Sequence, residues 1–181
     1  YNIKKNEIVF MFLGRINREK GFFDLIHLYQ LLKKNNVSSY FILIGEDEDN
    51  LTLRLKKDEN NNFIYLGHQS IPSNFLPCAD LFVMLSQREG FGVSVIQASS
   101  CSLPIIGYNV VGLKDSILDN KTGILIDNIY RKKDSTRLLK LSKSRYLRSR
   151  FGNAGRKFVK KYFEKSDVIN YLYEEINKYL I

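Results

Sequence analysis

Short apolar runs recur along this chain, and a glycine or a polar residue follows each of them. The runs cover residues 7–13, 39–44, 63–66, 81–85, 103–106 and 124–126. Each has the length and the continuous hydrophobicity of a strand that is buried on both faces. Segments with helical spacing of apolar residues separate them. Strands that alternate with helices predict a parallel sheet with helices on both faces, so we expect a Rossmann-like α/β fold.

The segments between the runs predict helices. A helix with apolar positions at helical spacing is expected after Lys20-Gly21, running toward Lys34. Another is expected over residues 93–101, which contain neither Gly nor Pro. Residues 71–78 predict a short helix with Pro72 near its first turn. A further helix is expected to begin at Gly112.

Two stretches are harder to interpret. Residues 46–49 are Glu-Asp-Glu-Asp, which fits a helix N-terminus because carboxylates stabilise the positive end of the helix dipole. We interpret this run as structural, since four consecutive carboxylates on a helix cannot all face one metal ion. From residue 130 onward the pattern is helical, with a predicted break at 151–153.

Length and composition narrow the class of protein. The 181 residues are enough for one domain with a sizeable core, and a hydrophobic content of 44% is ordinary for a globular protein. No apolar run approaches the length of a membrane span. Residues 1–5 lead into a strand rather than a signal peptide, and because residue 1 is Tyr, we expect a fragment of a longer protein.

Cysteine and histidine usage points away from a metal centre. Cys78 and Cys101 have no zinc-ligand spacing and no catalytic context. We therefore expect both to be small buried residues, in a protein that resides in a reducing compartment. With two His in the chain, a His-based metal site is not expected.

The formal charge of +9 is concentrated in one segment. Residues 131–165 contain fourteen Lys or Arg, opposed by Asp134 and Glu164 alone. Two interpretations stay open. The cations are the solvated faces of helices, or they contact phosphates on lipid or nucleic acid.

The stretch 79–107 contains the pattern around which we interpret the rest of the chain. It reads as a buried strand, a turn with the sequence Glu89-Gly90-Phe91-Gly92, a helix and a strand that begins after Pro104. The turn places free backbone N–H groups at a helix N-terminus, where anions such as phosphate bind. Its glycines allow a ligand to approach the backbone closely. Glu89 follows the strand's carboxyl end, which is where ligands of open α/β sheets bind.

A second group of polar residues follows the first strand. Gly14 and Arg15 end this strand, and Lys20-Gly21 precedes the next helix. Arg15 and Lys20 are therefore cations at the carboxyl end of a strand and beside a helix start, a place suited to a phosphate.

These two groups together resemble the donor-binding domain of the group 1 (family 4) glycosyltransferases. The family pattern is a Glu, then Gly-Phe-Gly, a second Glu eight positions after the first, and a Pro-led strand. Residues 89–92 and Pro104 match, whereas Gln97 stands where the family has its second Glu. The family's Gly-Arg and Lys-Gly pairs match at Arg15 and Lys20, and the resemblance extends from residue 7 to about 163.

The resemblance implies a role for each matching position. Arg15 and Lys20 contact the donor diphosphate, Glu89 meets the sugar hydroxyls, and these three are the catalytic candidates. Gln97 meets the ribose in place of a Glu. Backbone amides from residues 91–94 line the sugar and phosphate. The full set of donor-binding candidates is Gly14, Arg15, Lys20, His68, Glu89, Gly90, Phe91, Gly92, Val93, Ser94, Gln97 and Gly112.

The implied enzyme is a two-domain glycosyltransferase of the GT-B fold. We expect residues 1–181 to be its carboxy-terminal donor-binding domain, with a basic helical segment from about 130 to 181 and with the amino-terminal acceptor domain absent from this chain. Such an enzyme transfers a sugar with retention from a UDP- or GDP-sugar and needs neither a metal nor another cofactor. The expected acceptor is a lipid-linked or free saccharide in bacterial capsule or O-antigen (lipopolysaccharide) synthesis, in the cytoplasm or peripherally at the inner membrane face. This chain alone is expected to be inactive.

Other classes of protein stay open. The altered position 97 is compatible with an epimerase-like or non-catalytic nucleotide-sugar binder. A nucleic-acid-binding module requires aromatic residues among the C-terminal cations, but those present have the spacing of helix cores. We therefore expect no nucleic-acid partner. A dinucleotide-dependent oxidoreductase is not expected, because no Gly-x-Gly-x-x-Gly follows the first strand.

Overall fold

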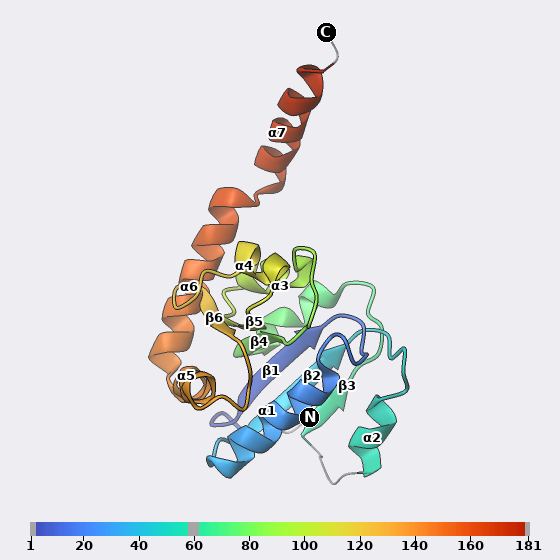
Figure 1. Ribbon diagram of the computed structural model, residues 1–181, viewed down its shortest axis with the longest axis vertical. Helices are drawn as coiled ribbons and strands as arrows, with labels where there is room; N and C mark the ends of the chain where they lie inside the picture. Colours follow the sequence, from blue (N-terminus) through green and yellow to red (C-terminus); the bar gives the residue numbers. More distant parts are fainter. Residues whose placement is uncertain (1–2, 58–61, 180–181) are drawn as a thin grey trace.

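The computed structural model describes residues 3–57 and 62–179, which form a parallel sheet flanked by helices (Figure 1). The sheet has six strands in the order β3-β2-β1-β4-β5-β6. This order is the one that defines a doubly wound Rossmann-like sheet, so the predicted fold class is confirmed. The strands are β1 (Ile8–Leu13), β2 (Ser39–Ile44), β3 (Phe63–Tyr65), β4 (Leu81–Met84), β5 (Ile105–Tyr108) and β6 (Gly123–Ile126).

Helices connect consecutive strands. Because the chain moves outward from β1 to β3 and then in the other direction from β4 to β6, right-handed crossovers place the two sets of helices on opposite faces. Figure 1 shows α1 and α2 on one side of the sheet and α3 and α4 on the other. The helices are α1 (Phe22–Lys34), α2 (Thr52–Lys57), α3 (Val93–Ser100), α4 (Val111–Ser116), α5 (Lys132–Lys143), α6 (Arg145–Tyr162) and α7 (Lys165–Asn177).

The core lies between the sheet and its helices. Phe10 of β1 and Phe41 of β2 are fully buried, and their rings stack with centroids 4.8 Å apart. Tyr29 of α1 and Phe63 of β3 extend this aromatic cluster. Each buried aromatic or aliphatic side chain contributes on the order of 1.5–3 kcal/mol, so this packing fixes the strands whose carboxyl ends carry the candidate site.

The predicted helix break at 151–153 is wrong. Helix α6 runs without interruption from Arg145 to Tyr162, and the helical segment is interrupted instead at Ser144 and at residues 163–164. Gly152 is buried where α6 crosses the turn before β5, and a Cβ at this position would overlap the carbonyl oxygen of Ser102. The glycine is therefore required for close packing between two elements and does not end a helix.

Two other local expectations need correction. Residues 71–78 form two short 3₁₀ helices, η1 (Pro72–Asn74) and η2 (Leu76–Cys78), because Pro77 lacks the N–H that a continuous α-helix needs there. The expectation that both cysteines are buried is wrong. Cys78 ends η2 at the surface and is exposed, and Cys101 is half-buried.

The acidic run 46–49 precedes α2 rather than forming its first turn. The helix begins at Thr52, and Asp47 caps it by accepting hydrogen bonds from the N–H groups of Leu51 and Thr52, both at 2.9 Å. The interpretation of this Asp as structural agrees with these contacts.

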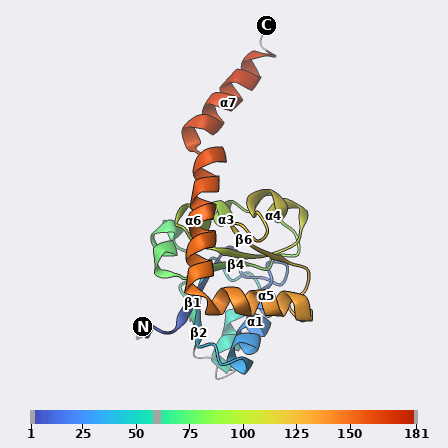
Figure 2. The same ribbon diagram turned by 90° about the vertical axis from the view of Figure 1, so that its left-hand side faces the viewer.

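The C-terminal helices run along one side of the molecule and then away from it. Helix α6 packs lengthwise against α3, and α7 continues outward with none of its described residues buried (Figures 1 and 2). Among the described residues, no helix combines the length and the apolar composition needed to cross a bilayer.

Candidate functional site

A cavity of about 510 Å³ opens at the carboxyl ends of β1 and β4. These two neighbouring strands begin crossovers in opposite directions, so the cavity lies at the topological switch point where open α/β sheets bind ligands. Nine of the twelve predicted donor-binding residues line it. They are Gly14, Arg15, Lys20, Glu89, Phe91, Gly92, Val93, Ser94 and Gln97.

The other three predicted residues do not line this cavity. His68 is exposed in the loop that follows β3. Gly90 is also exposed, although its neighbours on both sides are lining residues. Gly112 lies behind the loop of residues 89–92, the motif loop, where a Cβ would overlap the carbonyl oxygen of Glu89. Gly112 therefore supports the loop from below.

The centre of the site is an ion pair. Lys20 Nζ donates to Glu89 Oε1 at 2.6 Å, and the side chains of Lys20 and Glu89 are only 19% and 12% exposed. Ser86, which is completely buried, donates to the same carboxylate oxygen at 2.9 Å. Charge-assisted bonds in a partly dehydrated site are stronger than those at the surface, so this carboxylate is held in one place.

A second, more exposed pair lies at the rim of the cavity. Arg15 donates to Glu48 Oε1 at 2.9 Å, and Asn17 donates to Glu48 Oε2 at 2.7 Å. The Asn17 and Arg15 hydrogen bonds lower the pKa of Glu48, and the bond to Glu48 raises the pKa of Arg15. Asn17 also accepts from the N–H of Lys20, so it links the two cations of the site.

The motif loop ends in a helix N-terminus that faces the cavity. Gly92 has a φ of 78°, a left-handed conformation that glycine adopts without strain, and α3 begins at the next residue. The N–H of Val95 already bonds to the carbonyl of Gly92. In the part of the chain that the structure describes, the N–H groups of Val93 and Ser94 are left as free donors of the first turn.

Sequence reasoning missed three residues of this network, namely Asn17, Glu48 and Ser86. Asn17 lies between Arg15 and Lys20, and Ser86 lies three residues before Glu89. A hydrogen-bonding side chain this close to the predicted cations and carboxylate was the signal that the sequence offered. Glu48 lies far away in the chain. A bridge between Ile16 and Asp47 brings it to the site, and no local pattern reveals that contact.

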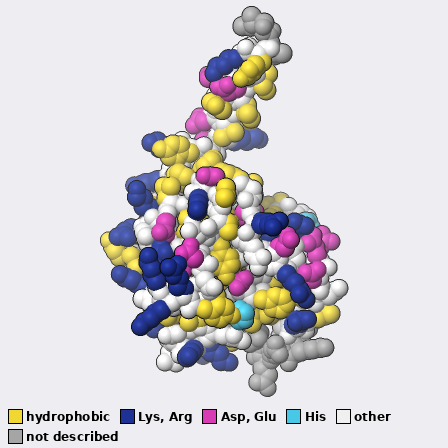
Figure 3. Space-filling view, in the orientation of Figure 1, with side chains coloured by type: hydrophobic (Ala, Val, Ile, Leu, Met, Phe, Trp, Pro, Cys, Tyr) yellow, Lys and Arg dark blue, Asp and Glu magenta, His cyan; other side chains and the backbone are white. Residues whose placement is uncertain are grey.

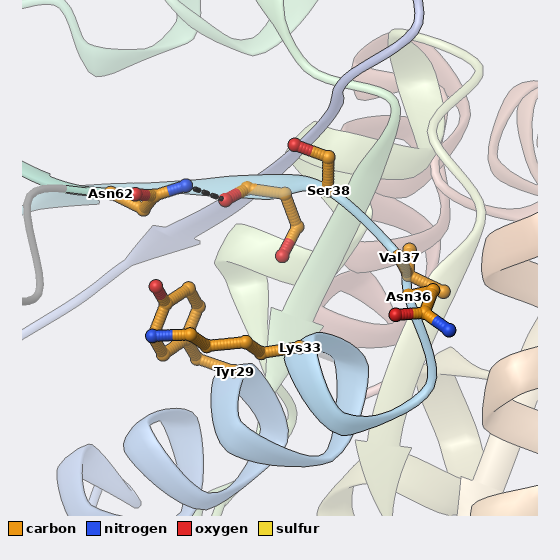
Figure 4. Close-up of a pocket in the computed structure, with 7 residues that line it drawn as sticks. Tyr29, Lys33, Asn36, Val37, Ser38 and Asn62 are labelled. Carbon is orange, nitrogen blue, oxygen red and sulfur yellow. Dashed lines mark hydrogen bonds between the residues drawn. The ribbon is translucent and has the colours of Figure 1, made fainter.

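A slightly larger cavity of about 550 Å³ lies at the amino ends of β2 and β3 (Figure 4). Lys33 and Asn62 line it together with Tyr29 and residues 36–39, and Lys33 is the one charged side chain among these lining residues. It combines neither two cations nor a carboxylate. The smaller cavity, with its paired charges at the carboxyl edge, is the better candidate site.

The comparison with known families agrees with the geometry. The profile described as "Glycosyl transferases group 1" matches residues 1–158. The chain belongs to this glycosyltransferase family. Capsular polysaccharide biosynthesis glycosyltransferase CapM of Staphylococcus aureus is 27% identical over 184 residues, which cover 99% of this chain and 48% of CapM. The UDP-Gal:alpha-D-GlcNAc-diphosphoundecaprenol alpha-1,3-galactosyltransferase of Escherichia coli is 28% identical over 131 residues, which cover 69% of this chain and 34% of that enzyme.

Solved structures of glycosyltransferases share the fold. A mutant of S. aureus TarM, crystallised with fondaparinux, alpha-GlcNAc-glycerol and UDP, superposes with a TM-score of 0.81 at 25% identity over 94% of this chain and 36% of TarM. Anabaena Alr3699/HepE with UDP-glucose has a TM-score of 0.81 at 15% identity over 96% of this chain and 49% of that protein. The resemblance to a GT-B fold is thereby confirmed. This chain spans about half the length of CapM and of HepE.

Proposed function

We propose that this chain binds the nucleotide-sugar donor of a retaining glycosyltransferase. The observation that carries the proposal is one cavity at the sheet's switch point that combines Arg15, Lys20 and Glu89 with the free amides of α3. Cations and helix-end amides attract a diphosphate, and a partly buried carboxylate accepts hydrogen bonds from sugar hydroxyls.

In the proposed reaction, the nucleoside diphosphate leaves the anomeric carbon of the donor sugar at this site. Negative charge grows on the diphosphate as that bond breaks, and Arg15 and Lys20 stabilise it through charge-assisted hydrogen bonds. The amides of Val93 and Ser94 add fixed dipoles aimed at the same charge. No step of this proposal requires a metal ion or a further cofactor. Among the described residues, no cluster of three or more His, Cys, Asp or Glu is arranged to hold a metal.

The acceptor binds to a second domain in this proposal. The relatives are about twice as long as this chain, and a GT-B active site is the cleft between two such domains. The 181-residue chain alone then binds donor without transferring the sugar. The names of the relatives support an acceptor that is lipid-linked or a saccharide in bacterial surface-polysaccharide synthesis. A cytoplasmic location is part of the proposal and rests on the family resemblance alone. Neighbours crystallised with UDP or with UDP-glucose support a UDP-sugar ahead of a GDP-sugar.

Calorimetric titration with UDP, GDP and uridine tests the donor-binding role. Arg15→Ala or Lys20→Ala removes a hydrogen bond to a charged group, a loss of about 1.5–3 kcal/mol, so UDP binding is expected to weaken by tenfold or more. Uridine binding is expected to stay unchanged. Lys33→Ala, which removes the cation of the other cavity, is the matched control. Equal losses for UDP and uridine would contradict the assignment of Arg15 and Lys20 to the diphosphate.

Contact with a membrane surface is a further part of the proposal. The Lys- and Arg-rich helices α5 and α6 carry many exposed cations, which Figure 3 shows along the side where these helices lie. Each cation near an anionic surface contributes roughly 1 kcal/mol, screened by salt. Co-sedimentation with phosphatidylglycerol vesicles is expected at low salt and not at high salt. No sedimentation at low salt would favour cations that are only solvated.

A further inference from the structure

Ser86 is buried directly beneath the candidate site. It follows β4 by two residues, its relative exposure is 0%, and it precedes Glu89 by three residues. Its hydroxyl lies 2.9 Å from Glu89 Oε1 and 3.1 Å from the sulfur of Met84. A hydroxyl has one proton to donate, and an ionised carboxylate is a far stronger acceptor than a thioether. The proton of Ser86 therefore points to Glu89.

The two donors on Glu89 use the same oxygen. Both Lys20 Nζ and Ser86 Oγ donate to Oε1. Oε2 has no hydrogen-bond partner within residues 3–57 and 62–179, and it is not sealed from solvent. Because Glu89 lines the cavity, its carboxylate is anchored through one oxygen and offers the other to a ligand.

We propose that Ser86 is a positioning residue that orients Glu89 so that Oε2 accepts a hydrogen bond from a hydroxyl of the donor sugar. Ser86 cannot touch the donor, since no part of it reaches the surface. The inference rests on the proposed function and adds to it the atom of Glu89 that contacts the sugar and the residue that fixes this atom.

The arrangement matters most when the diphosphate arrives. Lys20 lines the cavity, and a diphosphate competes with Glu89 for its ammonium group. As Lys20 turns toward the phosphates, Ser86 keeps its bond to Oε1, because Ser86 is shielded from the ligand. Ser86 then keeps the Glu89 carboxylate oriented toward the sugar while Lys20 binds the diphosphate. Loss of Ser86 therefore affects sugar recognition and leaves nucleotide recognition intact.

The test is a comparison of two ligands in calorimetric titrations of the 181-residue chain. The ligands are UDP and whichever of UDP-glucose, UDP-galactose and UDP-N-acetylglucosamine binds the wild type best. Ser86→Ala is expected to weaken UDP-sugar binding by about 5–20-fold, and UDP binding by less than about twofold. Ser86→Thr, which keeps the hydroxyl, is expected to restore most of the loss. Ser142→Ala removes another fully buried serine hydroxyl, one that bonds to a carbonyl within α5, and should leave both ligands unaffected.

The outcomes separate this inference from the function on which it rests. A wild type that binds neither UDP nor any UDP-sugar overturns the proposed function. If UDP binds but Ser86→Ala weakens both ligands equally, or neither, the role of Ser86 is overturned alone. The role of Ser86 is also overturned if the wild type binds UDP and all three UDP-sugars with equal affinity. Ser86→Cys, of similar volume but with a weak donor, replaces Ser86→Ala if that variant does not fold. A crystal structure of either variant with Glu89 unmoved also contradicts the proposal.

Discussion

Gly112 of α4 lies against the backbone of Gly90, so that a Cβ on Gly112 would lie 2.5 Å from the Gly90 carbonyl oxygen. Gly112→Ala should therefore push the motif loop outward and displace Glu89 from the cavity. We expect a loss of about 1–3 kcal/mol in the free energy of unfolding, as is usual for overpacking, together with weaker UDP binding. Urea unfolding and calorimetric titration measure the two effects.

Gly90→Ala is the matched control on the other side of this contact. A Cβ on Gly90 meets no atom within 4 Å, and the backbone there is not left-handed. Because Gly90 does not line the cavity either, we expect little change in stability or in UDP binding. If Gly90→Ala weakens binding as much as Gly112→Ala does, the ligand contacts Gly90 directly, as the family resemblance implies.

Helix α6 supplies a second test of close packing. A Cβ on Gly152 would overlap Ser102, so Gly152→Ala is expected to destabilise the protein despite the helix propensity of Ala, by about 1–2 kcal/mol. For a chain of this size that corresponds to a decrease in Tm of roughly 2–8 °C. Asn153→Ala changes the neighbouring exposed position and should leave Tm unchanged or slightly raised. A Gly152→Ala variant with a higher Tm would contradict the packing role.

These glycines show what the sequence can and cannot predict. Six apolar runs, each followed by a glycine or a polar residue, predicted the order of strands and helices, because a buried parallel strand can be recognised from its own residues. The purpose of Gly152 depends on Ser102, fifty residues away, so local reading predicted a helix break. For the same reason, the motifs located Arg15, Lys20 and Glu89, whereas Glu48 was missed.

The Asp47 cap of α2 predicts a pH dependence of stability. Burial disfavours its charged form, yet hydrogen bonds from Thr52 and Leu51 outweigh burial and hold the pKa of Asp47 below its usual value. A carboxylate whose pKa is lowered on folding stabilises the protein above its unfolded pKa, about 3.9, and loses that effect as the pH falls through its folded value.

Asp47→Ala should accordingly lower the free energy of unfolding by about 1 kcal/mol at pH 7, with a smaller difference from wild type below about pH 4. Urea unfolding at pH 7, 5 and 3 measures this. Asp47→Asn keeps one of the two capping oxygens but carries no charge, so at pH 7 its stability is expected to lie between those of wild type and Asp47→Ala. A wild-type advantage over Asp47→Ala that persists unchanged at pH 3 would show that the carboxylate charge has no part in the cap.

Gln97 gives the sharpest test of the family alignment. It is exposed on α3 and lines the candidate cavity, at the position where the family has a Glu that accepts hydrogen bonds from the ribose hydroxyls. A Gln can still pair with a hydroxyl through its single acceptor oxygen, but it lacks the charge assistance of a carboxylate. Gln97→Glu restores that assistance and also adds a negative charge near the diphosphate. The hydrogen-bond gain is the larger effect, because it acts at contact whereas the repulsion acts across several ångströms through solvent.

Gln97→Glu should therefore tighten UDP binding by about 5–30-fold, which corresponds to roughly 1–2 kcal/mol. Titration with 2′,3′-dideoxy-UDP separates the ribose contact from a general effect of charge, since most of the gain should disappear when the hydroxyls are absent. Gln30→Glu, at an exposed glutamine of α1 that does not line the cavity, controls for the added charge and should leave UDP binding unchanged. An equal gain with UDP and with the dideoxy ligand, or no gain at all, means that Gln97 does not contact the ribose. In that case α3 is aligned with the wrong positions of the family pattern, even though Glu89 and Gly92 at its start match.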